Sequence, residues 1–395
     1  MVNKNVFHHL GSTAILLFTA RLPAATAQLP TGSVSDVAQI RCPTTLQLNA
    51  HSACYTATVI CPGKDNELVT FGVTTPAAPK GTIVLHDGDA GTSPYQEPGI
   101  TNGFARDYLS AGFQVVQLAW GGTGWEGASP GSIKDGACRP ATFFQYIYQN
   151  FYGGGRAPVY NPTTNPTAGF CLQGHSAGAG AVAYYLTHYG GSAYVDKALF
   201  SSGPHFAEID QGCEVPAPSS PVTICPLGGG ADAWPCAAGV DPPGDWTEYP
   251  TYTYGQLSGW TASPCSDGKP TSLAQDAAWS IMSIVDLQQT PPDANYVMPQ
   301  TALSAYLCHY TGSQVNPSEA QGWLYFSQFQ QTNVASLVVN EVNDCQNNGA
   351  PSPEYVFYAT YVNGTTGTPL PKFSWAPTVM FNDMTDPVDG CVRRH

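Results

Sequence analysis

The chain has 395 residues and a formal net charge of −14, and only 11% of its residues are charged. Hydrophobic residues make up 43% of the chain, enough for a substantial core, so the composition excludes intrinsic disorder as the main state. The 14 Lys and Arg residues stand against 28 Asp and Glu residues. This balance excludes general nucleic-acid binding, because a polyanion is held by a cationic surface.

The first 27 residues have the pattern of a secretory signal peptide. Lys4 gives a basic start, Leu10–Ala20 is an apolar run, and Ala25-Thr26-Ala27 supplies small residues for cleavage. We expect cleavage after Ala27, secretion to the extracellular space, and a single domain over residues 28–395. The apolar run is shorter than the roughly 20 residues that cross a bilayer. No later stretch is long and uncharged enough, so we predict no transmembrane segment.

All twelve cysteines follow residue 27, and an even count in an exported chain favours disulfide bonds. The rival is zinc, but the Cys54/Cys61 and Cys225/Cys236 pairs are too widely spaced for CxxC knuckles. No HExxH motif occurs, so we expect neither a metal nor another cofactor. The pairing of the cysteines is not fixed by the sequence. Asn363 begins an N-x-[ST] sequon and is the predicted glycosylation site.

The first half of the chain alternates between strand and helix patterns. We predict antiparallel strands within residues 40–75, at 56–61 and 68–74, then strands over 81–86, 113–120, 169–173 and 195–201, and helices over 102–111, from Pro140 to the glycines at 153–155, and over 178–189. Short apolar runs such as residues 81–86 are typical of central parallel strands that are covered on both faces. The alternation between residues 81 and 206 predicts an α/β protein with a mostly parallel sheet.

The second half begins with a break in this rhythm. Residues 207–275 contain four cysteines, many Pro and Gly residues, and little periodicity. We expect a disulfide-tied insertion or lid rather than a separate domain. The strand–helix–strand order resumes at 301–308, 317–329 and 334–342. We predict that the last fifty residues are rich in loops and that Cys391 holds the tail.

The most informative motif is Gly174-His175-Ser176-Ala177-Gly178, which matches GxSxG. A predicted strand precedes it and a predicted helix rich in Gly and Ala follows. This setting is that of a nucleophile elbow, a strained strand-to-helix turn that exposes the serine hydroxyl to a base and needs small flanking residues. The Ala177 N–H at the start of the helix is a candidate oxyanion donor.

With this motif, residues 80–345 resemble the α/β-hydrolase fold of serine esterases and lipases. The resemblance implies a central, mostly parallel sheet flanked by helices. It also implies that the loop His86-Asp87-Gly88-Asp89 supplies a second oxyanion donor from the backbone of Asp89 or Gly88. For His86, packing of this loop is at least as good an interpretation as a direct chemical role.

Cys138 and Cys171 precede the helix and the elbow strand respectively. We therefore expect a disulfide bond between these two cysteines.

The catalytic base is less plainly indicated. The family order is Ser, then Asp or Glu after a late strand, then His after the last strand. The histidines that follow Ser176 are His188, His205, His309 and His395. We expect His188 on the surface of the helix after the elbow, and His205 in the pocket wall.

Four arrangements of the triad remain open. In the favoured one, Ser176 works with His309 and Asp344, so that the two partner types are exchanged between adjacent loops. In the second, an earlier acid, Asp232 or Asp286, orients His309. In the third the triad has decayed, and in the fourth His395 folds back into the site. A histidine is required because imidazole both accepts and returns the serine proton near neutral pH.

Residues 122–127 formally match GxGxxG but are followed by Ala-Ser-Pro-Gly rather than by a helix. Dinucleotide binding is therefore not predicted. We expect this loop to border the substrate pocket, with Trp120 and Trp125 as walls.

The sequence thus favours a secreted, monomeric serine hydrolase that cleaves carboxylic esters through an acyl-enzyme on Ser176. Its expected partner is a small-molecule, lipid or aryl ester, and no nucleic acid. Two alternatives remain: a catalytically degenerate hydrolase that acts as an extracellular ligand-binding or accessory protein, and a peptidase, which would use the same triad chemistry.

Overall fold

The structure is a computed structural model. It describes residues 28–96, 99–101, 103–127, 132–204, 206–207, 265–266, 269–270, 282–285, 293–309, 322, 325–326, 328–329, 333–343, 357–362, 365–366 and 376–395.

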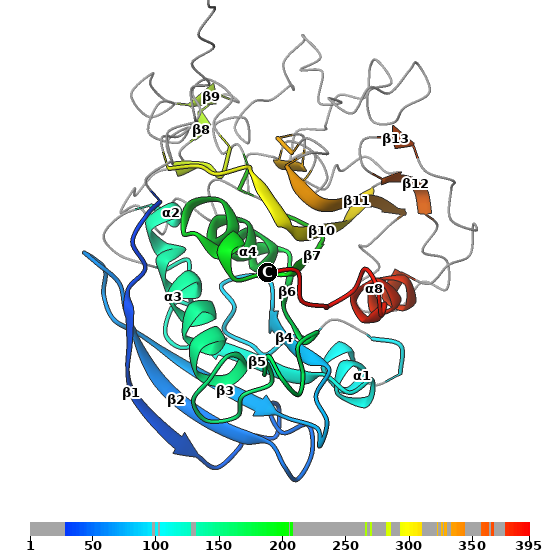
Figure 1. The fold of residues 1–395 in the computed structure, drawn as a ribbon. Helices are drawn as coiled ribbons and strands as arrows, with labels where there is room; N and C mark the ends of the chain where they lie inside the picture. Colours follow the sequence, from blue (N-terminus) through cyan, green and yellow to red (C-terminus); the bar gives the residue numbers. More distant parts are fainter. Residues whose placement is uncertain are drawn as a thin grey trace, which may run out of the picture.

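One large sheet runs through the described part of the chain, with eleven strands in the order β1-β2-β3-β5-β4-β6-β7-β10-β11-β12-β13 (Figure 1). Its strands are β1 (Ser33–Ile40), β2 (Ala53–Ile60), β3 (Glu67–Thr74), β4 (Gly81–His86), β5 (Gln114–Trp120), β6 (Gly169–His175), β7 (Lys197–Ser201), β10 (Met298–His309), β11 (Val334–Asn343), β12 (Phe357–Val362) and β13 (Thr365–Thr366). The short strands β8 (Cys265–Ser266) and β9 (Lys269–Pro270) pair separately.

The centre of the sheet is parallel. Strands β5, β4, β6, β7, β10 and β11 run in one direction, while β1, β2, β3, β12 and β13 pair antiparallel at the two sides. The first three strands of the sheet are therefore antiparallel. The order of strands in the sheet departs from the chain order at β5 and β4, since β5 lies between β3 and β4. Together with the serine turn after β6, this topology is the α/β-hydrolase fold, which confirms the predicted fold class.

Helices cover both faces of the sheet. They are α1 (Phe104–Ser110), α2 (Ile133–Gly136), α3 (Cys138–Ile147), α4 (Ala177–His188) and α8 (Ala376–Thr385), with a π-helical turn, η1 (Tyr148–Tyr152), after α3 and a 3₁₀ turn, η2 (Gly191–Ala193), after α4. Helices α3 and α4 lie on one face, and α1 and α8 lie on the other (Figure 1). Alternate residues of β4 enter the two cores, because Val84 packs toward α3 and α4 while Ile83 and Leu85 pack toward α1 and α8. No helix in the described residues is long and apolar enough to span a membrane.

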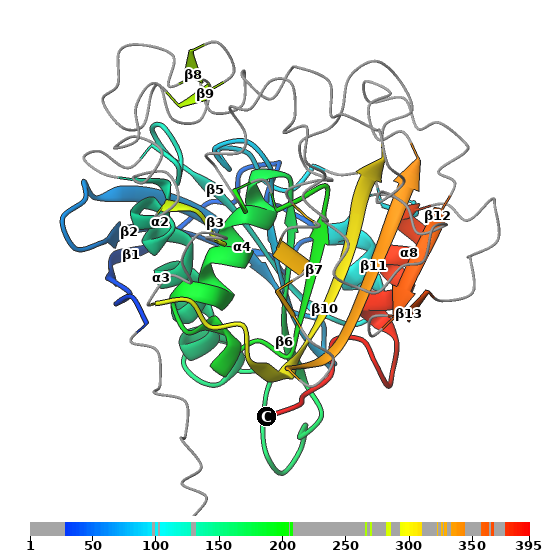
Figure 2. The same ribbon diagram turned by 90° about the horizontal axis from the view of Figure 1, so that it is seen from above.

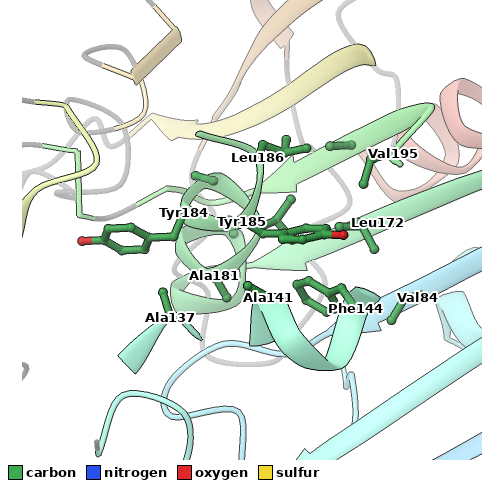
Figure 3. Packing of buried hydrophobic residues seen from close by; sticks show 14 of the residues in the cluster. Val84, Ala137, Ala141, Phe144, Leu172, Ala181, Tyr184, Tyr185, Leu186 and Val195 are labelled. Carbon is green, nitrogen blue, oxygen red and sulfur yellow. The ribbon is translucent and has the colours of Figure 1, made fainter. Parts of the chain in front are cut away.

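Small side chains let α4 approach α3 closely. Figure 3 shows Ala141 of α3, and Ala137 immediately before this helix, on the side that faces Ala181 of α4. The rings of Phe144 and Tyr185 fill the space nearer the sheet, with centroids 5.5 Å apart. All these side chains are fully buried. The tight packing fixes the helix that follows the serine turn.

Three disulfide bonds join described cysteines: Cys42–Cys54, Cys61–Cys138 and Cys171–Cys391. The expected Cys138–Cys171 bond is therefore wrong. Helix α3 and strand β6 lie in different layers, so Cys138 meets the end of β2 while Cys171 points to the opposite face. The predicted tie of the tail through Cys391 is confirmed.

Several element boundaries differ from the sequence-based expectations. Strand β1 and helix α2 were not predicted, and helix α8 lies within the last fifty residues, which were predicted to be rich in loops. Helix α3 begins at Cys138, two residues before Pro140. A proline is tolerated there because the first four N–H groups of a helix have no intrahelical acceptor.

Chain segments on the two sides of the expected insertion are hydrogen-bonded to each other. Ile284 N donates to Phe206 O at 2.9 Å, and Val285 N donates to Ala207 O at 2.8 Å. The chain thus leaves the sheet after β7 and returns to the same place, although most of residues 207–275 lie outside the described residues.

Candidate active site

Ser176 occupies a strained turn between β6 and α4. Its backbone angles are φ 52° and ψ −121°, a conformation that non-glycine residues rarely adopt. The Ser176 N–H donates to Ser201 O of β7 at 2.8 Å, and Ser176 O accepts from Ala179 N at 3.0 Å. The turn is thus fixed on both sides, and strain held in this way at the end of a central strand is typical of a nucleophile.

The two motif glycines are required by close backbone contacts. A β-carbon on Gly174 would overlap the first turn of α4, and one on Gly178 would overlap the carbonyl oxygens of His86 and Asp87. The GxSxG spacing therefore lets the turn close and lets the loop after β4 lie against the start of α4. Both contacts explain why the motif needs glycine there.

The loop after β4 crosses directly beside the serine. A β-carbon on Gly88 would lie 2.8 Å from the β-carbon of Ser176, and Asp89 adopts a positive φ of 50°. Trp120 N donates to Gly91 O at 2.9 Å, and Trp125 N donates to Ala90 O at 3.1 Å. The backbone of residues 88–89 is thereby held next to Ser176, close to the N-terminus of α4, where oxyanion donors are needed.

His86 stabilises this loop through two hydrogen bonds of its buried ring. Its side chain is buried, Nδ1 donates to Asp87 O at 2.8 Å, and Nε2 accepts from Trp120 Nε1 at 3.0 Å. Burial lowers the pKa of His86 to about 4. A neutral ring with both nitrogens engaged is not a proton acceptor for Ser176, so the packing interpretation is confirmed.

The side chains of Trp120 and Trp125 pack behind the loop that follows β4. Trp120 and Trp125 are both buried, and their rings lie 6.4 and 6.2 Å from the His86 ring. Neither is among the described residues of the pocket wall, so their expected role as walls is wrong. Burial, with a further contribution from the Asp89 charge, holds the pKa of Glu126 well above its usual range.

A cavity of about 300 Å³ opens beside Ser176. Its described wall consists of Asp87, Gly88, Asp89, Thr92, Ser93, Gln96, His175 and Ser176. Sequence reasoning did not single out Thr92, Ser93, Gln96 or His175. The signal was available, because residues that follow a central parallel strand gather at the carboxyl edge of the sheet.

His175 precedes Ser176 and lies against Ser201, with 3.4 Å between Nδ1 and the hydroxyl oxygen. Burial lowers its pKa to about 4, although the nearby Asp87 charge opposes the shift. Its ring therefore stays neutral near pH 7.

His188 is not on the surface, which corrects the sequence-based expectation. It is fully buried, with Nδ1 3.1 Å from Asp293 Oδ2 and Nε2 3.0 Å from Ile284 O. Asp293 also pairs with Lys134 at 2.7 Å. Charged partners from distant parts of the chain, which periodicity does not reveal, allow this histidine to be buried.

His395 lies at the wrong end of the sheet for catalysis. The tail runs beside the start of β6, where Ala168 pairs with Val392, whereas Ser176 follows the end of that strand. Figure 2 shows the C-terminus at the opposite end of the sheet from the tips of β10 and β11. Seven residues of strand separate the two places by roughly 20 Å, so the arrangement with His395 is wrong.

The backbone position of His309 is described, as the last residue of β10. Strand β10 lies parallel to β7, and Ser202 N donates to Tyr306 O at 2.9 Å. His309 pairs in register with Asn343, the last residue of β11. Asp344 follows Asn343 in the chain and lies outside the described residues, as do Asp232, Asp286, His205 and Asn363.

Comparison of the sequence with protein-family models and with curated proteins gave no match. Among solved structures, similar chains include acetyl xylan esterase 1 from Thermoanaerobacterium sp. JW/SL YS485, at 11% identity and a TM-score of 0.41 over 79% of this chain and 80% of that one. Brefeldin A esterase, a bacterial homologue of human hormone-sensitive lipase, has 14% identity and a TM-score of 0.38 over 77% and 70%. An esterase of Pyrobaculum calidifontis has 14% identity and a TM-score of 0.36 over 73% and 74%.

The class of the protein follows from its own topology and turn geometry. It has the α/β-hydrolase fold, with a serine in a nucleophile elbow at the carboxyl edge of the parallel strands.

Proposed function

We propose that this protein is a secreted carboxylic ester hydrolase, active as a monomer, that works through an acyl-enzyme on Ser176. The observation that supports the proposal best is the strained Ser176 turn, with the Gly88–Asp89 backbone packed against it and a cavity beside it. The three disulfide bonds suit an oxidising compartment and so support the interpretation of residues 1–27 as a signal peptide. The Asn363 sequon would then be available for glycosylation.

In the proposed reaction, Ser176 Oγ attacks the ester carbonyl while His309 takes its proton. The N–H groups of Ala177 and of Asp89 or Gly88 hold the oxyanion of the tetrahedral intermediate. The proton passes to the departing alcohol, and the acyl group stays on Ser176. Water, deprotonated by the same histidine, then releases the acid. Asp344 would orient His309 and stabilise its charged form.

A variant series tests the choice of base. His309→Ala should lower kcat/KM on 4-nitrophenyl acetate by about 10³-fold or more, because no other group would accept the serine proton. His395→Ala is the matched control and should stay within about twofold of the unaltered protein. Equal activity of the His309→Ala variant would refute the assignment.

The same assay tests which acidic residue completes the triad. Asp344→Asn should lower kcat by about 10²- to 10⁴-fold, since the ring of His309 would lose its orienting charge. Asp232→Asn and Asp286→Asn should have little effect. A large loss in either of these two variants, with Asp344→Asn active, would move the acid to the earlier position.

The second candidate function is that of an extracellular ligand-binding protein. It is favoured by one sequence fact, namely that no histidine occurs between Asn343 and His395, where the family usually places its base. Ligand binding without turnover of any ester would favour this candidate.

A further inference from the structure

The wall of the cavity beside Ser176 has an unusual composition for an ester site. Besides the elbow residues and Gly88, its described part consists of Asp87, Asp89, Thr92, Ser93 and Gln96, whose side chains bear carboxylates, hydroxyls and an amide. The described wall contains no Ala, Val, Leu, Ile, Met, Phe, Tyr or Trp side chain, and its one ring is the imidazole of His175. Small-molecule pockets are usually lined mostly by apolar groups.

This composition bears on which part of an ester the cavity can hold. An alkyl chain gains affinity from apolar walls, by about fourfold for each buried methylene. The described wall has no large aliphatic side chain to pack against such a chain. It offers acceptors on the carboxylates and both donors and acceptors on the hydroxyls and the amide, which is the set that pairs with several hydroxyl groups at once.

The charge of the wall further limits which chemical groups the cavity can bind. Asp87 and Asp89 are acidic, and the described wall contains no Lys or Arg. An anionic group in the cavity would face like charges without a cationic partner. A neutral group rich in hydroxyls fits both the charge and the hydrogen-bonding capacity.

The loop that bears these groups is anchored at both ends. At one end, Gly91 N donates to Gly88 O at 3.0 Å, and Gly91 O accepts from Trp120 N. At the other, Tyr95 is buried, and its hydroxyl accepts from Gln173 Nε2 at 2.8 Å. Polar groups held in place before binding lose less entropy when a ligand is bound.

From these observations we infer that the cavity beside Ser176 binds a hydroxyl-rich group, so that the substrate is a sugar ester with a small acyl group. A volume of about 300 Å³ is at the low end for small-molecule pockets and suits a single sugar ring. The inference rests on the proposed ester hydrolysis and adds the class of alcohol to it. Thr92, Ser93 and Gln96 would determine the specificity.

The test compares two acetates whose alcohol parts differ in their hydroxyl groups and in the ring oxygen. 6-O-Acetylglucose carries a hydroxylated ring, and cyclohexylmethyl acetate is its apolar counterpart. We expect kcat/KM to be higher for the sugar ester by about tenfold or more, because several hydroxyls would be paired at the wall. Along 4-nitrophenyl acetate, butyrate and octanoate, kcat/KM should stay level or fall.

Two variants locate the effect. Gln96→Leu and Thr92→Val should each lower the ratio of kcat/KM for 6-O-acetylglucose over cyclohexylmethyl acetate by about threefold or more. Thr163→Val is the matched control, because Thr163 is exposed in the loop before β6, at the other end of the sheet. It should leave the ratio unchanged.

The outcomes separate this inference from the proposed function. Labelling of Ser176 by a fluorophosphonate without a preference for the sugar ester, or with a rate that rises along the acyl series, overturns the inference alone. The absence of both labelling and hydrolysis overturns the proposed function and the inference together.

Discussion

The two edges of the parallel sheet are built in opposite ways. At the carboxyl edge, Asp89 after β4, Ser176 after β6 and Ser202 after β7 all have φ between 50° and 53°. At the amino edge the tail is bound tightly, through the Cys171–Cys391 bond, the Lys197–Asp383 ion pair at 2.6 Å, and other contacts. Backbone strain thus gathers where chemistry is proposed, and the tail is cross-linked to the opposite edge of the sheet.

The contrast shows how the fold tolerates its strained turns. A non-glycine residue at positive φ costs about 1 kcal/mol or more, and the surrounding structure must hold it in place. Strand β6 bears both features, with Cys171 bonded to the tail near its start and Ser176 immediately after its end. The disulfide bond at the amino edge therefore stabilises the fold, and this offsets the cost of the strained turns at the carboxyl edge.

The largest expected effect concerns the amino edge. Replacing Cys171 and Cys391 by Ala should lower the free energy of unfolding by about 5 kcal/mol, because the bond closes a 220-residue loop. Replacing Cys42 and Cys54, only 12 residues apart, should cost about 3 kcal/mol. Denaturant unfolding measures both values. A smaller loss for the long loop than for the short one would contradict the role given to this edge.

The next largest effect concerns His86, the buried last residue of β4 at the carboxyl edge. The pKa of His86 is about 4 in the folded protein, below its usual range, so the unfolded chain takes up the proton first as the pH falls. Burial of neutral His86 therefore gives its full contribution to the free energy of unfolding above about pH 6.5. As the pH falls toward 4, the free energy of unfolding decreases by about 3 kcal/mol through this residue. His86→Gln should remove this part of the pH dependence of unfolding.

The control for this measurement is His51→Gln, which alters an exposed histidine in the loop before β2. It should leave the slope of stability against pH unchanged. A wild-type slope in the His86→Gln variant would mean that His86 is not buried in its neutral form.

The smallest effect tests the strain itself. Ser202→Gly should raise the free energy of unfolding by about 1 kcal/mol, because glycine adopts φ 53° without a steric penalty. Asp36→Gly, at a positive φ in the bulge of β1, should stabilise similarly and leave activity unaltered. A destabilised Ser202→Gly variant would show that the side chain, rather than the backbone, is what matters there.

Much of the fold could be predicted from the sequence because its central strands are short apolar runs with glycine-rich ends. Strand β4 matches its predicted range of 81–86, and the elbow was evident from GxSxG between a strand and a helix. The pairing of Cys171 with Cys391 was not evident, since it depends on which face of β6 each side chain meets. The burial of His188 likewise depends on Asp293, about a hundred residues away.

The candidate site was only partly predictable for a related reason. Ser176 and Ala177 belong to a local motif, so the spacing of that motif predicted them, and the 88–89 backbone was predicted from the resemblance to the α/β-hydrolase fold. Thr92, Ser93 and Gln96 reach the cavity only because the loop after β4 folds across the elbow. That contact arises from the sheet order, which places β4 beside β6.

The most direct measurement for the whole account is the trapping of the nucleophile. The purified protein is treated with a fluorophosphonate, digested, and its peptides are weighed by mass spectrometry. We predict one adduct, on the peptide that contains Ser176, with no adduct in the Ser176→Ala variant and no ester hydrolysis by that variant. An adduct on a different residue, or full esterase activity of Ser176→Ala, would contradict the account.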